Sequence, residues 1–312
     1  MVMVLILVTA PIGYNAHAQE QIVSSSDGDD LPIIHNPNLK VELIVEGLDL
    51  PTTMAFLGDN DILVLEKDKG TVQRIVNGKM LPEPLLDVNV ATSVERCMCG
   101  IALSSQSNTG LTYVFLYYTE AELTDSEDII EAKAPLGNRL YRYELVNNKL
   151  INPVLLLDLP AIPGPRHNGG AIMIGPDNNL YVPIGDVDGT GMGEAFETKA
   201  QNYLDGVEPD GRSGILRITQ DGQPVGGDGG ILGNTHPLNL YYAYGIRNSF
   251  GFDFDPVTGN IWDTENGPGN SDEINLVEPG FNSGWQEIQG MASNTDDGFN
   301  LEEDIVNFEG KG

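Results

Sequence analysis

The sequence predicts an all-β protein of the β-propeller type. One strand–turn–strand pattern recurs four times, its turns are built from Gly, Asn and Asp, and no long amphipathic helix interrupts it. These turn residues adopt the left-handed backbone angles of tight hairpins, and the intervening strands are rich in β-branched and aromatic residues. Small sheets cannot bury both faces alone, so we expect the repeats to stack around a common axis.

The four repeats share an apolar strand, a polar turn, a second apolar strand and a later third strand. Their second strands begin at Ile62, Tyr113, Leu180 and Ile261, so successive repeats lie 51, 67 and 81 residues apart. A four-stranded blade needs about 40–50 residues, and the excess leaves room for inserted loops. A large β-sandwich is the competing architecture. The expected strands are 54–57, 62–64 and 71–75; 100–103, 113–116 and 139–143; 171–174, 180–182 and 214–218; and 251–254, 261–262 and 272–276.

The start of the chain predicts export. Residues 1–11 are apolar but too few to span a membrane, and Ala16-His17-Ala18 matches a small-x-small cleavage site, although no Lys or Arg precedes Lys40. We therefore expect a signal peptide over 1–18, a polar tether over 19–40 and the propeller domain over 41–312. The expected location is periplasmic or extracellular, without stable membrane insertion after cleavage.

The net charge of the chain indicates which classes of partner it is expected to bind. The 312 residues include 16 Lys and Arg and 46 Asp and Glu, which gives a formal net charge of −30. Such a field repels phosphate backbones and anionic lipids, so nucleic-acid binding is not expected. Acidic loops attract divalent cations instead.

Two cysteines, Cys97 and Cys99, are separated by a single residue. A conventional zinc site needs more ligands at wider spacing. A strained bridge, a soft-metal contact and two free thiols all remain open, and we favour free thiols.

One polar segment opens the third repeat, and another follows its second strand. His167 lies in a Gly/Pro-rich loop, residues 164–170, whose glycines would let a flat ligand approach the backbone. This setting suggests a general base, with a hydrogen-bonded loop histidine as the alternative. Asp186, directly after the strand, is placed to orient the imidazole or to form an Asp-Gly turn or a surface cation loop.

The fourth repeat adds a cation and a set of hard oxygen donors. Arg247 and Asn248 occupy the same topological place as His167, where a guanidinium can hold a carboxylate or an oxyanion, or can join blades structurally. Residues 265–275 are dense in carboxylates, amides and tight turns, and 282–285 form another turn with an aromatic residue. Ca²⁺ prefers such ligands, so we favour a calcium site over a solvated acidic loop.

Taken together, residues 43–285 resemble the soluble PQQ-dependent aldose sugar dehydrogenases, the glucose/sorbosone dehydrogenase family. The stretches that carry the resemblance are GLDLPTTMAFL, ERCMCGIAL, RHNGGAIMIGPDNNLYVPIGD, GILRI, YGIRNSFGFDFDP and ENGPGNSDEINLVEPGFNSGW. The resemblance implies a six-bladed propeller, of which this chain holds about four blades and part of a fifth, with the C-terminal blades missing.

The resemblance also implies a reaction. PQQ lies over the central channel, His167 removes the proton of the sugar's anomeric hydroxyl, hydride passes to PQQ, and a lactone remains. Asp186 orients the base, and Arg247 stabilises charge on the cofactor. The implied cofactor contacts are Glu95, which stands where relatives commonly have Gln, with Arg247, Asn248, Gly267 and Pro268. The implied Ca²⁺ ligands are the carbonyls of Gly267 and Pro268, and at a second, structural site Glu273 and the Ser283 carbonyl.

Two other functions compete with this interpretation. One alternative is a non-catalytic extracellular propeller that serves as a binding or scaffold module. The other is a Ca²⁺-dependent lactonase, which would use the same oxygen-rich loop to hold its calcium ion. For the sugar dehydrogenase we expect a small sugar substrate and an external electron acceptor. The sequence leaves the sugar, the acceptor and the oligomeric state open.

Overall fold

The computed structural model describes residues 34–104, 110–122, 135–187, 197–226, 230–268, 271–290 and 305–308. Within these ranges the chain forms sixteen β-strands, two 3-10 helices, η1 (Lys199–Gln201) and η2 (Leu238–Leu240), and no α-helix. The all-β prediction is therefore confirmed. The predicted signal peptide and residues 19–33 of the tether lie outside the described residues, and residues 34–40 carry no strand.

Four antiparallel sheets follow one another along the chain, and we call them blades 1 to 4. Blade 1 contains β1 (Pro51–Gly58), β2 (Asp61–Glu66), β3 (Thr71–Val76), β4 (Lys79–Met80) and β5 (Leu86–Asp87). Blade 2 contains β6 (Met98–Leu103), β7 (Thr112–Ala121), β8 (Pro135–Val146) and β9 (Lys149–Leu159). Blade 3 contains β10 (Met173–Ile174), β11 (Leu180–Ile184), β12 (Gly214–Ile218) and β13 (Tyr241–Tyr244). Blade 4 contains β14 (Ser249–Phe254), β15 (Ile261–Glu265) and β16 (Glu273–Val277).

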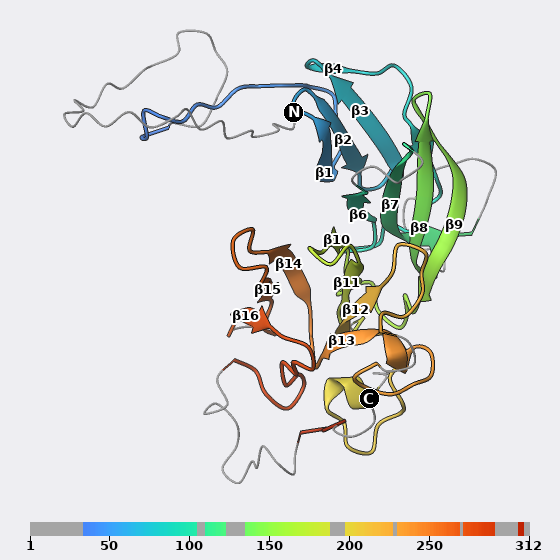
Figure 1. The fold of residues 1–312 in the computed structure, drawn as a ribbon, viewed down its shortest axis with the longest axis vertical. Coiled ribbons are helices and arrows are strands. Elements are labelled where there is room, and N and C mark those ends of the chain that lie inside the picture. Colours follow the sequence, from blue (N-terminus) through green and yellow to red (C-terminus); the bar gives the residue numbers. More distant parts are fainter. Residues whose placement is uncertain are drawn as a thin grey trace.

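The blades lie in order around an arc, with β1, β6, β10 and β14 toward its inside (Figure 1). These inner strands contact one another from blade 1 to blade 2 and from blade 2 to blade 3. This is the four-blade propeller arrangement that the repeats predict. The predicted part of a fifth blade falls mainly on residues 291–304, outside the described residues.

Apolar side chains between neighbouring blades form the core. On β7, Val114, Leu116 and Tyr118 face blade 1, whereas Phe115 and Tyr117 face blade 3. All of them are buried, so the strand is covered on both faces. Because alternate residues of a strand point to opposite faces, stacking the sheets explains why β7 is a nearly continuous apolar run.

The outward face of blade 4 is uncovered among the described residues. Its exposed side chains include Phe250, Trp262 and Ile274, which lie on three adjacent strands. A following blade covers this face in a propeller.

The core between blades 1 and 2 predicts a measurable stability cost. Leu116→Ala removes a fully buried side chain and should lower the free energy of unfolding by about 2–5 kcal/mol. The matched control is Leu155→Ala on β9, whose side chain is 45% exposed and should cost only about 0.5 kcal/mol. Urea titrations of both variants would measure the difference, and equal costs would contradict the stacked-blade core.

Candidate functional site

His167 and Asp186 form a buried acid–imidazole pair. His167 lies in the loop between β9 and β10, and Asp186 follows β11. Nδ1 of His167 lies 2.6 Å from Oδ1 of Asp186, and the two residues are 4% and 9% exposed. A carboxylate at this position accepts a hydrogen bond from the Nδ1–H group of the imidazole. In that tautomer the lone pair is on Nε2, as a general base requires. The two residues predicted to act together are therefore in contact.

A glycine lets the loops of blades 3 and 4 meet at this pair. A Cβ on Gly185 would lie 2.8 Å from the Cβ of His167, and the carbonyl oxygen of Arg247 would be closer still. The next backbone N–H, that of Asp186, donates to that carbonyl at 2.9 Å. Close approach of the backbone to its neighbours therefore requires glycine here.

Glu95 holds the His167 loop from blade 2. The backbone N–H of His167 donates to Oε2 of Glu95 at 2.7 Å, and the N–H of Glu95 donates to the carbonyl of Pro165 at 3.1 Å. His167 has a positive φ of 58°, a conformation that needs such support in a non-glycine residue. Glu95, which the resemblance predicts to contact the cofactor, therefore also binds the backbone of His167, the predicted base.

The two glycines after His167 do not leave room for a ligand, so that part of the sequence interpretation is wrong. A Cβ on Gly170 would lie 2.6 Å from the Cβ of Cys99, and one on Gly169 would collide with the carbonyl of Pro183. Protein atoms occupy the space, and both glycines have positive φ angles. They allow the loop to pack on blade 2 and on β11 rather than exposing the backbone.

Cys97 and Cys99 are joined by a disulfide bond, so the expectation of free thiols is also wrong. The bond lies at the start of β6, beside Gly170. It braces the segment that carries Glu95, whose carbonyl lies 3.8 Å from the Sγ atom of Cys99.

Arg247 lies between the His167–Asp186 pair and the oxygen-rich loop, residues 265–275. Its Nη1 donates to the carbonyls of Asn266 and Gly267, at 2.8 and 3.2 Å. Its own N–H donates to Oε1 of Glu265 at 2.6 Å. The predicted partner Asn248 is buried beside it, and its carbonyl accepts the N–H of Asn266 at 3.1 Å.

Trp285 is the contact that sequence reasoning missed. Its indole Nε1–H donates to Oδ2 of Asp186 at 2.9 Å, and its ring centroid lies 5.3 Å from the guanidinium carbon of Arg247. Its place after a Gly-rich turn in an oxygen-rich region was the available signal. No spacing rule connects it to Asp186, which lies 99 residues earlier.

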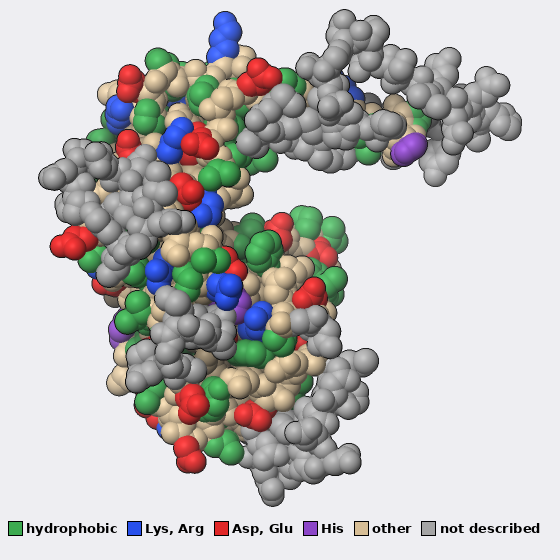
Figure 2. Space-filling model, turned by 180° about the vertical axis from the view of Figure 1, so that it is seen from behind, with side chains coloured by type: hydrophobic (Ala, Val, Ile, Leu, Met, Phe, Trp, Pro, Cys, Tyr) green, Lys and Arg blue, Asp and Glu red, His purple; other side chains and the backbone are tan. Residues whose placement is uncertain are grey.

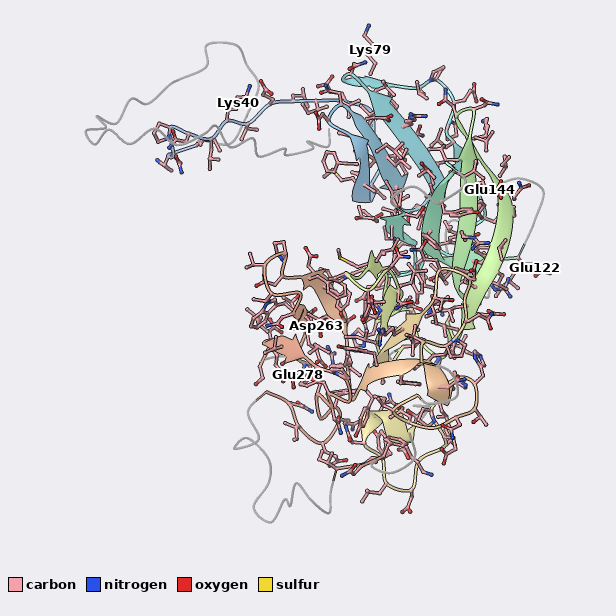
Figure 3. All side chains as sticks on the ribbon, in the orientation of Figure 1. Lys40, Lys79, Glu122, Glu144, Asp263 and Glu278 are labelled. Carbon is pink, nitrogen blue, oxygen red and sulfur yellow. A yellow bond between two sulfur atoms is a disulfide. The ribbon has the colours of Figure 1, made fainter. Side chains whose placement is uncertain are left out.

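Acidic side chains gather on the inner side of β15 and β16. The Ser283 hydroxyl donates to Oε2 of Glu265 at 2.5 Å, and Glu273 accepts the N–H of Gly290 at 2.6 Å. Burial raises the pKa of Glu265 to about 8 and that of Asp263, on the same strand, to about 6. Figure 3 labels Asp263 on β15. Burial thus makes both carboxyls harder to ionise than they are in water, and a nearby cation would favour their ionised form.

A small pocket joins this acidic cluster to Arg247. Its lining includes Arg247, Glu273, Trp285 and several further residues: Glu265, Asn266, Gly267, Pro268, Ser271, Ser283, Ile288 and Gln289. Every predicted Ca²⁺ ligand is among them. Within the described residues, no group of three or more His, Cys, Asp and Glu side chains is placed to hold a metal ion. A cation here would depend on backbone and amide oxygens as well.

The structure thus places all the predicted site residues in one connected region. Hydrogen bonds link Glu95, His167 and Asp186, and Arg247 connects them to the pocket. In Figure 2, acidic and basic side chains are interspersed over the upper part of the visible face, and several basic side chains also lie near its middle. The loops that contribute the site come from blades 2, 3 and 4.

Comparison with known proteins shows which family the sequence resembles. The sequence profile of the glucose/sorbosone dehydrogenase family matches residues 48–304. Quinoprotein glucose dehydrogenase B of Acinetobacter calcoaceticus is 27% identical over 302 residues, which cover 88% of this chain and 59% of that protein. The uncharacterized protein slr1608 of Synechocystis is 28% identical over 263 residues, which cover 81% of this chain and 60% of that protein.

A solved structure shows the same likeness. The PQQ-bound aldose sugar dehydrogenase of Streptomyces coelicolor is 27% identical, with a TM-score of 0.61, covering 85% of this chain and 68% of that one. This chain spans about 60% of the length of the curated relatives it matches. Because the family profile extends over blades 1 to 4, the chain belongs to the glucose/sorbosone dehydrogenase family.

Proposed function

We propose that this chain contributes the catalytic base, a cofactor-binding cation and calcium ligands to a PQQ-dependent sugar dehydrogenase. The reaction is oxidation of the anomeric hydroxyl of an aldose to a lactone. The observation that carries the proposal is the 2.6 Å contact between His167 and Asp186 in a chain of this family.

His167 would act as the base through Nε2, the ring nitrogen that Asp186 does not engage. With Nδ1–H donated to Asp186, Nε2 of His167 accepts the proton of the sugar hydroxyl. Asp186 then stabilises the imidazolium ion and keeps the ring in one orientation. Burial of both residues keeps water away from this proton transfer.

The residues beside the pocket fit an anionic cofactor in part. PQQ, when bound, supplies the acceptor for the hydride that leaves the sugar carbon. Arg247 lines the pocket and Asn248 adjoins it, so a guanidinium would face the anion. Glu95 would reach the cofactor only through the carboxylate oxygen that the N–H of His167 does not engage. A carboxylate repels an anion, so Glu95 fits the cofactor less well than the other predicted contacts do.

Calcium fits the oxygen donors around the same pocket. Oδ1 of Asn266 is buried and has no hydrogen-bond partner among the residues that the structure describes. It is adjacent in sequence to the carbonyls of Gly267 and Pro268, and Glu273 and Ser283 line the same pocket. These are the hard ligands that Ca²⁺ takes, and we propose that they hold it.

The remaining parts of the proposal concern location and partners. The predicted signal peptide favours a periplasmic or extracellular enzyme that passes electrons to an external acceptor. Among the described residues, none forms a helix that is long and apolar enough to span a bilayer.

Replacement of the base tests the reaction. His167→Ala should lower kcat for aldose oxidation with added PQQ and Ca²⁺ by about 100-fold to 10,000-fold, because a positioned general base is lost. The control is His236→Ala, which changes an exposed histidine and should leave dye-linked turnover unchanged. Unchanged turnover in His167→Ala would exclude this residue as the base.

Absorbance titration with PQQ separates the competing functions. A dehydrogenase should take up PQQ stoichiometrically. A non-catalytic binding module should take up none, and a lactonase should hydrolyse esters with Ca²⁺ alone.

Calcium should stabilise the fold through Glu273. Saturating Ca²⁺ should raise the Tm of the wild-type chain by about 5 °C, since a ligand that binds only the native state stabilises it. Glu273→Gln should lose most of this rise, whereas Glu278→Gln, an exposed glutamate just after β16, should retain it. Differential scanning fluorimetry with EDTA and with Ca²⁺ measures both, and identical responses would argue against Glu273 as a ligand.

A further inference from the structure

We infer that Trp285 is a positioning residue that aligns both the His167–Asp186 pair and Arg247. This inference rests on the proposed function, in which His167 is the base. Among the described contacts, the Trp285 side chain meets Asp186 and Arg247 rather than the imidazole. It acts through the carboxylate on one side and through the guanidinium on the other.

The first step concerns the carboxylate. Asp186 has two oxygens, of which Oδ1 faces Nδ1 of His167 and Oδ2 accepts the indole N–H of Trp285 at 2.9 Å. Because an indole nitrogen only donates, it can bind the carboxylate but cannot compete with it for the imidazole proton. Two bonds in different directions fix the rotation of the carboxylate about its side-chain axis. Without the indole donor, Asp186 would be free to turn away from the imidazole.

The second step concerns the cation. The guanidinium of Arg247 lies over the Trp285 ring, in the geometry of a cation–π contact. The same side chain donates to the carbonyls of Asn266 and Gly267. Arg247 is thus held on two sides, and one of them is the ring whose edge holds Asp186. The Trp285 side chain therefore fixes the position of Asp186 relative to that of Arg247.

The third step concerns what holds Trp285 itself. Its backbone N–H donates to the carbonyl of Gly245 at 2.9 Å, and its carbonyl accepts from Nδ2 of Asn202 at 2.8 Å. The next N–H, that of Gln286, donates to the carbonyl of Gln201 at 2.8 Å. These bonds tie the tryptophan to blade 3 and to the connection between blades 3 and 4. Its ring is placed before any ligand arrives.

The experiment removes the donor and keeps a ring. Trp285→Phe deletes the indole N–H but retains an aromatic face for Arg247. The matched control is Trp262→Phe, because Trp262 is the other tryptophan in the chain and is 43% exposed on blade 4. Both variants and the wild type are labelled with ¹⁵N at histidine and at tryptophan and compared by NMR without cofactor.

The NMR results that support the inference are specific. The wild type should show one indole proton that exchanges slowly and resonates downfield, and Asp186→Asn should move that signal. His167 should carry its proton on Nδ1 in the wild type and in Trp262→Phe. In Trp285→Phe its ¹⁵N shifts should move toward a mixture of the two tautomers.

Activity with PQQ and Ca²⁺ gives the second readout. Trp285→Phe should lower kcat about tenfold, as expected for a lost hydrogen bond to a charged group, and should change KM less than about twofold. If the wild type shows no dehydrogenase activity but Trp285→Phe still changes the His167 tautomer, the proposed function is overturned and the role of Trp285 stands. Wild-type kcat and an unchanged His167 tautomer in Trp285→Phe would overturn the inference. If Trp285→Phe does not fold, the Asp186→Asn variant gives the test instead. An indole proton signal that Asp186→Asn leaves unchanged would then overturn the inference.

Discussion

Burial of both faces of each middle sheet is the constraint on which the site depends. The apolar side chains of β7 and β11 each divide between the preceding and the following blade, so neither blade can be placed without its neighbours. This stacking fixes where the loops before each inner strand emerge. The His167 loop before β10 and the Arg247 loop before β14 are consecutive examples. The backbone of Arg247 therefore lies within hydrogen-bond distance of Asp186, the residue that pairs with His167.

Asp186 is the point at which these loops are joined. Its N–H binds the blade 4 loop through the Arg247 carbonyl, and its two carboxylate oxygens bind His167 and Trp285. Its neighbour Gly185 has no side chain and so allows the approach. A buried carboxylate is costly unless its oxygens are bonded, and here both have a donor. The residue that pairs with His167 therefore also ties the loops of consecutive blades together.

The sequence was informative where a local pattern carries the structure. Hairpin turns and apolar strands predicted the first three strands of every blade, because turn chemistry and period-two burial are local properties. The outer strands β9 and β13 were missed. Most of β9 is exposed and lacks a clear alternation, and β13 follows a long excursion. The candidate residues were found from glycine-rich motifs. Their partners Trp285 and Glu265 were not assigned, since only the stacking of blades reveals such distant contacts.

The same limit, that distant contacts cannot be read from the sequence, explains the two errors. Gly169 and Gly170 were interpreted by chain chemistry alone, whereas Pro183 and Cys99 fill the space beside them. Cys97 and Cys99 lie on either side of one residue, a spacing that does not reveal whether their sulfurs meet. Structural disulfides persist mainly in oxidising compartments. Export, which we propose from the N-terminal sequence, would place the bond in such a compartment. The bond also braces the segment that carries Glu95 to the base.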